Sequence, residues 1–252
     1  MTEFADTVSI VTGGASGIGL ATALALAERG STVAVFDIAV DGLDERLHGF
    51  VADVADRGSV DAAVAAVAER FGRIDIVINN AGVSAVGTVA ENDDAEWARI
   101  LDINVTGMAR VSAAVLPWLR KSPSAAIVNV CSIAALNGLP RRALYSASKG
   151  AVLSLTFAMA TDHVREGIRV NCISPGTVSS PFVERMLQNF DDPAAERAAL
   201  DSRQATGRMV TPEEVAGGIL YLASPLSGST TGTALEVDGG IHHLRIRPIG
   251  EG

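Results

Sequence analysis

The stretch that decides the fold of this chain is Ile10-Val11-Thr12-Gly13-Gly14-Ala15-Ser16-Gly17-Ile18-Gly19. An apolar strand-like run enters it, and an apolar helix-like run at residues 20–27 leaves it. Glycines let the backbone turn tightly and approach a pyrophosphate, and the N-terminus of the following helix attracts negative charge. The glycine spacing differs from the commoner G-x-G-x-x-G fingerprint, so a plain strand-to-helix turn is the alternative interpretation. The stretch therefore predicts a strand–turn–helix unit, with nucleotide binding as its functional interpretation.

Strand-like and helix-like segments continue to alternate along the chain. Several strand candidates are continuous apolar runs, as expected for parallel strands covered on both faces. The predicted strands are residues 8–11, 32–36, 49–52, 74–78, 126–131, 169–173 and 234–237. The further predicted helices are residues 59–71, 96–119, 145–166 and 212–222, the last with Thr211 as N-cap and Pro212 in its first turn. This alternation predicts an α/β fold, a single Rossmann-type doubly wound parallel sheet of about seven strands with helices on both faces.

One segment interrupts the alternation. Residues 181–207 are helical in pattern and follow the Pro175-Gly176 turn. A long insertion of this kind often covers a binding site, so we expect a helical substrate lid. We expect residues 1–252 to form a single catalytic domain, since α/β folds often reach this size undivided.

Composition narrows the class of protein. Hydrophobic residues make up 48% of the 252 residues, enough for a large core. The net charge of −9 and the pI near 4.9 argue against binding to nucleic acid, which requires a basic face. Two uncharged runs, residues 122–140 and 215–235, are rich in turn-forming residues, so no membrane span is expected. With no signal-peptide pattern visible, we expect a cytoplasmic enzyme that acts on a small molecule.

A Tyr–Lys pair carries the strongest chemical signal. Tyr145 and Lys149 are four residues apart in a predicted helix, so their side chains lie on one face, one turn apart. An ammonium near a phenol stabilises the phenolate. The pair therefore predicts a tyrosine that exchanges a proton during catalysis.

Together with the glycine turn, these residues are similar to the motifs of the short-chain dehydrogenase/reductase family over essentially the whole chain. The matching motifs, in order, are Thr12 to Gly19, Asn79-Asn80-Ala81-Gly82, the tetrad Asn104, Ser132, Tyr145 and Lys149, and Pro175-Gly176. The resemblance implies an oxidoreductase that interconverts a secondary alcohol and a ketone by hydride transfer to or from a nicotinamide cofactor. It implies no catalytic metal, and it implies a homotetramer.

The resemblance also implies a role for each catalytic residue. Tyr145 is the general acid/base, and Lys149 assists it and holds the hydroxyls of the nicotinamide ribose. Ser132 hydrogen-bonds the reacting oxygen. Asn104 fixes a backbone kink and a water that relays protons from Lys149.

Cofactor choice is indicated by Asp37, at the end of the second predicted strand. It lies about 20 residues past the glycine turn, where a carboxylate binds adenosine ribose hydroxyls and repels a 2′-phosphate. Residues 38 and 39 are not basic, so NAD is favoured over NADP. The family resemblance implies the following cofactor contacts: Gly13, Ser16, Gly17, Ile18, Gly19, Asp37, Asp53, Val54, Asn80, Ala81, Gly82, Tyr145, Lys149, Pro175, Gly176, Val178 and Ser180.

The substrate is indicated by three arginines. The sequence around them resembles a subgroup of the family that includes cytosolic 3-hydroxybutyrate dehydrogenase-like enzymes and 2-keto-3-deoxy-L-fuconate dehydrogenases. In that subgroup, arginines matching Arg142 and Arg203 hold a carboxylate, and Arg185 matches a third when a one-residue gap is allowed. We therefore expect a small hydroxy acid or an acidic sugar derivative as substrate.

Two alternatives stay open at this point. The first is a dehydrogenase of an uncharged alcohol, sugar or steroid, or a 3-oxoacyl-carrier-protein reductase, although Asp37 argues against this last activity because such reductases usually take NADPH. The second is a non-catalytic nucleotide sensor on the same fold, which would have no reason to keep the intact tetrad.

Overall fold

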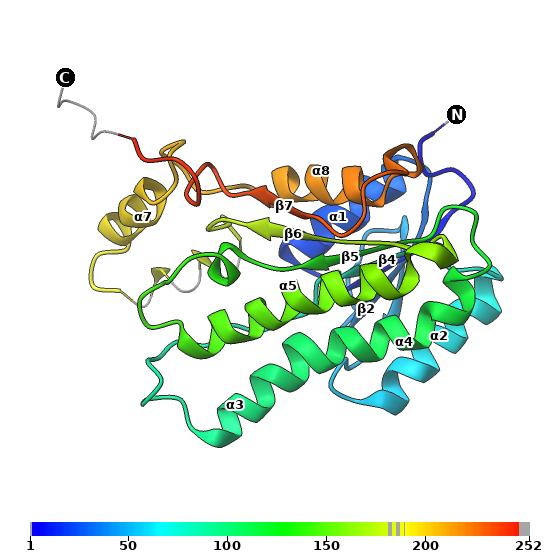
Figure 1. The fold of residues 1–252 in the computed structure, drawn as a ribbon, viewed down its shortest axis with the longest axis horizontal. Helices are drawn as coiled ribbons and strands as arrows, with labels where there is room; N and C mark the ends of the chain where they lie inside the picture. Colours follow the sequence, from blue (N-terminus) through cyan, green and yellow to red (C-terminus); the bar gives the residue numbers. More distant parts are fainter. Residues whose placement is uncertain (1, 181–182, 185–186, 189, 247–252) are drawn as a thin grey trace.

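The computed structural model describes residues 2–180, 183–184, 187–188 and 190–246. At its centre is a seven-stranded sheet in the order β3-β2-β1-β4-β5-β6-β7, with every neighbouring pair parallel (Figure 1). The strands are β1 (Val8–Thr12), β2 (Thr32–Asp37), β3 (Leu47–Val51), β4 (Ile76–Asn79), β5 (Ala126–Val130), β6 (Arg169–Pro175) and β7 (Ala234–Val237). This arrangement confirms the doubly wound parallel sheet expected from the apolar runs.

Helices cover both faces of the sheet (Figure 1). One layer holds α1 (Gly17–Glu28) and α8 (Pro212–Ala223), and the other holds α2 (Arg57–Phe71), α4 (Gly107–Leu119) and α5 (Ala143–His163). Two shorter helices are α3 (Asp94–Leu101) and α7 (Pro193–Ser202). None of the helices described here has the length and apolar character needed to cross a membrane.

The two helical layers explain why the strands are apolar on both faces. Val35 of β2 and Ile219 of α8 belong to one buried cluster, while Ile127 of β5 and Val115 of α4 belong to another. All five residues of β5 are buried. A strand enclosed in this way has no polar face, and its sequence becomes a continuous apolar run.

The predicted continuous helix over residues 96–119 is wrong in its middle. The structure has α3, then a π-helical turn at Asp102–Thr106, then α4. Helix α3 begins at Asp94 because the side chain of Asp93 caps it, accepting a hydrogen bond from the backbone of Glu96 at 2.8 Å. The widened turn is a common sign of a functional site within a helix, and it carries Asn104.

Other element ends agree with the sequence more closely. The predicted cap of α8 is confirmed: Thr211 accepts a hydrogen bond from the Glu214 backbone, and Glu214 accepts one from the Thr211 backbone. Helix α5 begins at Ala143 and ends at His163, and the predicted last residues form a 3-10 turn at Val164–Glu166. Gly167 follows this turn with a positive φ of 78°.

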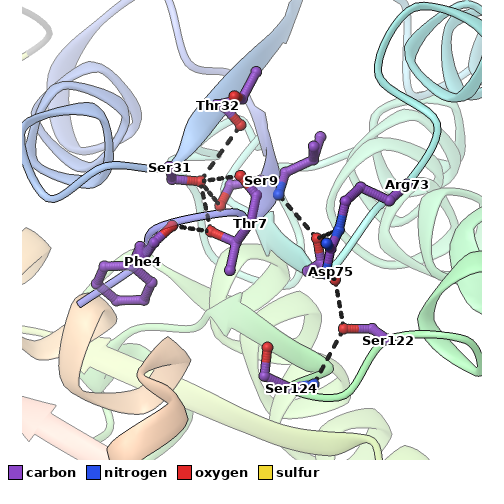
Figure 2. A network of polar contacts seen from close by, with 10 residues as sticks. Phe4, Thr7, Ser9, Ser31, Thr32, Arg73, Asp75, Ser122 and Ser124 are labelled. Atoms are coloured by element: carbon purple, nitrogen blue, oxygen red, sulfur yellow. Dashed lines mark hydrogen bonds and ion pairs between the residues drawn. The ribbon is translucent and has the colours of Figure 1, made fainter. Parts of the chain in front are cut away.

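A polar network fastens the segments that lead into the amino ends of the strands (Figure 2). Asp75, which is 1% exposed and directly precedes β4, accepts hydrogen bonds from the Val8 backbone at 2.9 Å and from Ser122 Oγ at 2.6 Å. Arg73 donates to it through Nε and Nη2, both at 2.8 Å. Burial alone would raise the pKa of Asp75, but these donors outweigh burial and lower the pKa. One carboxylate thus ties together the segments that begin β1, β4 and β5.

Candidate active site

The predicted site residues gather where the strands end. In an open parallel sheet, ligands bind outside the carboxyl ends of the strands. The residues at or just beyond these ends are Gly13 after β1, Asp37 at the end of β2, Asn80 after β4, Ser132 after β5, and Pro175-Gly176 at the end of β6. The fold therefore brings the sequence motifs to one edge of the sheet.

The glycine turn is held against the loop that follows β4. Asn80 Nδ2 donates to the carbonyls of Thr12 and Gly13 at 2.9 and 3.0 Å. Thr12 Oγ1 accepts from the backbone of Asn80 and of Ala81, both at 2.9 Å. A Cβ on Gly19 would lie 2.2 Å from the Gly13 carbonyl oxygen, and Gly13 has a φ of 62°. These positions require glycine because the turn packs backbone directly on backbone.

The first turn of α1 is open to a negative ligand. Ser16 is its N-cap but makes no side-chain capping bond, and no acidic residue occupies the first turn. The amides of Gly17, Ile18 and Gly19 therefore have no partner within the helix, and they offer donors to an anion. The side chain of Ser180, after β6, comes within 4.0 Å of the position of a Cβ on Gly17. This contact brings the loop after β6 beside the glycine turn.

Asp37 borders the same turn. Its Oδ2 accepts from the Ala15 backbone at 3.1 Å, and its Oδ1 accepts from the Ile38 backbone at 2.8 Å. The side chain is half-buried. Each carboxylate oxygen keeps a second lone pair, so the group is oriented and still able to accept from a hydroxyl.

Asn104 is completely buried and joins two parts of the site. Its Oδ1 accepts from the Val83 backbone at 2.8 Å, and its Nδ2 donates to the Val83 carbonyl at 2.9 Å. The same Nδ2 donates to Ser148 Oγ at 3.1 Å. Ser148 in turn donates to the Tyr145 carbonyl at 2.8 Å. The π-helical turn thus fastens the loop after β4 to the helix that carries Tyr145 and Lys149.

Tyr145 and Lys149 lie on one face of α5, as their spacing predicts. Lys149 Nζ lies 5.7 Å from the centre of the Tyr145 ring. The lysine is 4% exposed, and Nζ donates to the Val130 carbonyl at 2.9 Å. Val130 is the last residue of β5, two residues before Ser132. A nearly buried ammonium is therefore held between the tyrosine and the end of the strand that leads to the serine.

Ser132 is half-buried at the start of a short 3-10 turn, Ile133–Ala135. Its Oγ accepts from the Ala134 backbone at 3.1 Å, which fixes the rotamer of the hydroxyl group. The hydroxyl proton remains free to be donated elsewhere. The four tetrad residues thus come from the π-helical turn, the end of β5 and the start of α5.

The remaining predicted cofactor contacts lie on loops around this edge. Val54 is buried against Gly107 of α4, while Asp53 is exposed and accepts from the Ala55 backbone. Gly82 lies so close to Asn104 that a Cβ there would be 3.2 Å from Oδ1. Val178 pairs with Val210 in an isolated bridge.

The arginines predicted to bind a substrate carboxylate differ in their burial and in their contacts. Arg142, at the N-cap of α5, is half-buried, and its Nη1 donates to Ser84 Oγ at 3.1 Å and to the Ala85 carbonyl at 3.0 Å. Arg203 is exposed at the end of α7. Arg185 lies outside the described residues, as do four other positions of the predicted lid, 181–182, 186 and 189.

Some residues of the site were missed by the sequence analysis. Thr12 binds the loop after β4 to the glycine turn, and Ser148 accepts a hydrogen bond from Asn104, yet each looks like an ordinary residue within a motif. Asn137, five residues after Ser132, hydrogen-bonds His242 of the C-terminal segment at 3.0 Å. No local pattern links two residues that far apart, so only the fold reveals this contact.

Comparison with known proteins identifies the family. A family model described as enoyl-(acyl carrier protein) reductase matches residues 13–242. The chain belongs to the short-chain dehydrogenase/reductase family. It is 39% identical over 248 residues to a cis-4-hydroxycyclohexanecarboxylate dehydrogenase of Sinomonas cyclohexanicum, covering 94% of this chain and 97% of that protein. It is 37% identical over 245 residues to 2-(S)-hydroxypropyl-CoM dehydrogenase 3 of Xanthobacter autotrophicus, covering 93% of this chain and 96% of that protein.

Solved structures of this family share the fold. A variant of actinorhodin polyketide ketoreductase, crystallised with NADPH, matches with a TM-score of 0.89 and 33% identity, over 94% of this chain and 98% of that chain. As a short-chain dehydrogenase/reductase, the chain is an oxidoreductase that acts on a secondary alcohol or ketone. The cofactor of such enzymes is NAD or NADP.

Proposed function

We propose that this chain is an NAD(H)-dependent dehydrogenase of a small secondary alcohol that carries a carboxylate, with Tyr145 as its acid/base. The observation that carries the catalytic part is the placement of Lys149, whose buried ammonium lies between the Tyr145 ring and the Val130 carbonyl. The proposal takes residues 1–252 as one catalytic domain, 181–207 as its substrate lid, and a cytoplasmic homotetramer as its working form.

The residues at the carboxyl edge fit a dinucleotide. The Gly13–Gly19 contact leaves a cradle that a Cβ would fill, and the uncapped start of α1 suits a pyrophosphate. Asp37 would accept from adenosine ribose hydroxyls and repel a 2′-phosphate, which supports NAD(H) over NADP(H). The other loops around this edge supply Asp53, Val54, Asn80, Ala81 and Gly82 on one side, and Pro175, Gly176, Val178 and Ser180 on the other. When bound, the nicotinamide supplies the hydride chemistry.

The protein's own residues handle the proton and position the substrate. In alcohol oxidation, the Tyr145 oxygen accepts the proton of the substrate hydroxyl as a phenolate. The neighbouring Lys149 ammonium stabilises this phenolate. The Ser132 hydroxyl, oriented by the bond that it accepts from the Ala134 backbone, donates its proton to the reacting oxygen. Asn104 keeps α5 and the loop after β4 in register, so that these groups remain aligned.

Three observations support an anionic substrate. Arg142 uses Nη1 for Ser84 and Ala85, and the contacts described for it leave Nη2 and Nε available to a carboxylate. Arg203 lies on a segment fastened to the loop after β6, because the neighbouring Gln204 accepts from the Thr177 backbone. The relative that is 39% identical is named for an alcohol that also carries a carboxylate.

A substrate panel tests this proposal. Small hydroxy acids, their amides, and neutral alcohols and sugars would be offered with NAD+ or NADP+, and kcat/KM compared. We expect hydroxy acids with NAD+ to be the best pair, and Arg142→Ala or Arg203→Ala to lower kcat/KM for the acid roughly ten- to a hundred-fold, the value of a charge-assisted hydrogen bond at ~1.5–3 kcal/mol. The same variants should change little for the amide, because a direct contact makes the two changes non-additive.

Arg141→Ala is the matched control for the substrate test. Arg141 is adjacent to Arg142 but is exposed and paired with Glu91 at 2.9 Å. The Arg141→Ala substitution should leave the ratio of kcat/KM for the acid to kcat/KM for the amide unchanged. Equal use of acid and amide by the wild-type protein would refute the carboxylate, and a preference for NADP+ would refute the cofactor assignment.

The neutral-alcohol alternative has one observation in its favour. The Nη1 contacts of Arg142 brace the loop at Ser84 and Ala85, and this bracing could be its whole purpose. In that case Arg142→Ala would lower activity equally for acids, amides and neutral alcohols.

A further inference from the structure

Three potential metal ligands meet at the free edge of the sheet, where the C-terminal segment folds back beside β7. Glu236 lies on β7, and His242 and His243 follow the Asp238-Gly239-Gly240 turn. One ligand atom of each of these three residues lies within 4.8 Å of the other two. The spacing along the chain does not predict a metal role for these histidines, because it matches no familiar ligand pattern. We propose that Glu236, His242 and His243 form a Zn²⁺ site.

The contacts around His242 hold it in the form that binds a metal. Asn137 Nδ2 donates to the Ile133 carbonyl at 3.2 Å, which turns Asn137 Oδ1 toward His242. That oxygen lies 3.0 Å from His242 Nδ1, so it accepts the Nδ1 proton and leaves the Nε2 lone pair for an ion. In metal-bound histidines, the ring nitrogen that does not bind the metal usually donates its proton to an oxygen acceptor of this kind.

The backbone of the segment is also fixed. Asp238 is 6% exposed, and its carboxylate accepts from the Gly240 backbone at 2.7 Å and from the His242 backbone at 2.9 Å. Glu236 belongs to a strand, and its side chain is 23% exposed. The backbone of Glu236 and of His242 is therefore fixed before an ion binds, which lowers the ordering cost of binding.

The third ligand already meets the first at a suitable separation. His243 Nε2 lies 3.1 Å from Glu236 Oε2. Ligands at 2.0–2.2 Å from a tetrahedral zinc are about 3.3–3.6 Å apart. An ion between them would replace the proton that the imidazole shares with the carboxylate. A modest movement of His242 would complete three protein ligands, with water in the fourth position.

The ligand types select the metal. Two imidazoles and one carboxylate suit zinc and other borderline transition ions, whereas magnesium and calcium prefer sites made of oxygen alone. An ion here would join the edge strand to the C-terminal segment. Through Asn137, it would also reach the loop that begins at Ser132. The site therefore links the edge strand to the C-terminal segment, and it lies beside the loop that begins at Ser132.

Calorimetric titration of the full chain with Zn²⁺, without a polyhistidine tag, tests the proposal. We expect one ion per chain and a rise in Tm on adding Zn²⁺. Glu236→Gln, His242→Gln and His243→Gln should each weaken binding at least tenfold and abolish most of the rise. Asn137→Ala should weaken binding several-fold, because it releases the His242 ring.

The chain offers a close control. His163 also lies 3.0 Å from a carboxylate, that of Glu166, but no second imidazole takes part in that ion pair. His163→Gln should therefore leave Zn²⁺ binding unchanged. The proposal is overturned if the wild-type chain shows no saturable Zn²⁺ binding, if Mg²⁺ binds equally well, or if His163→Gln weakens binding as much as His243→Gln does. His243 is exposed, so its replacement should leave folding intact, and Tm without metal checks this.

Discussion

Replacing Asn104 by alanine tests how the site is held together. The substitution removes three buried hydrogen bonds, two to the Val83 backbone and one to Ser148 Oγ. At about 1 kcal/mol of net stability per bond, the loss is roughly 3 kcal/mol. For a chain of this size, 1 kcal/mol shifts Tm by about 2–4 °C, so Tm should fall by about 6–12 °C. Urea unfolding followed by tryptophan fluorescence gives the free energy directly.

Activity separates a positioning role from a merely structural one. Asn171 is the matched control, because it is also completely buried and also binds backbone, at Thr230 and Thr233. Asn171→Ala should lose roughly 2 kcal/mol on the same reasoning and keep its turnover while folded. At a temperature where both variants are folded, Asn104→Ala should show kcat at least ten-fold lower, because Tyr145 and the loop after β4 lose their connection. Equal turnover in the two variants, or a stability loss below 1 kcal/mol in Asn104→Ala, would refute the reasoning.

Three further outcomes are expected. Tyr145→Phe keeps the ring but removes the transferable proton, so turnover should fall ~10²-fold or more while NAD+ affinity, measured by fluorescence titration, stays within a few-fold; near-normal turnover would remove Tyr145 from the mechanism. Asp37→Ser should narrow the preference for NAD+ over NADP+, measured as a ratio of kcat/KM, since it removes a repulsive charge; an unchanged ratio would contradict this. Asp75→Asn should be less stable than wild type at pH 7. Because folding lowers the pKa of Asp75, its contribution is complete above about pH 3.9, the ordinary value, and is lost as the pH falls through the lower folded-state pKa. The stability gap between the two proteins should therefore close in acid, and a constant gap would show that the charge is not responsible.

Local patterns in the sequence were enough to predict the parallel sheet and the loops at the carboxyl ends of its strands. The apolar runs mark β1, β2, β4, β5 and β6 because these strands are covered by helices on both faces, and the glycine turn requires glycine because its backbone packs on itself. The Tyr145–Lys149 spacing predicts a shared face, since one helical turn fixes it. These features depend on contacts within a few residues, and they are readable from the chain.

Features that depend on distant contacts leave no local pattern in the sequence. The π-helical turn between α3 and α4 leaves no mark in the periodicity of residues 96–119, and only the family resemblance implied a kink at Asn104. Helical periodicity continues across a π-helical turn, so the apolar pattern indicates one helix. The engagement of Arg142 by Ser84 and Ala85 and the meeting of Glu236 with His243 likewise come from the packing of separate loops.

The Asp75 network lies where β1, β4 and β5 begin, and the catalytic loops lie where the strands end. This separation bears on how such a chain can change over time. The bonds that fasten β1, β4 and β5 at their amino ends involve none of the residues proposed to bind cofactor or substrate. Substitutions in the loops at the carboxyl edge therefore leave this anchoring intact, so new specificities can be tried without unfolding the scaffold. Directed evolution for a different alcohol should accordingly accept changes around Ser84 and Arg203 more readily than at Asp75.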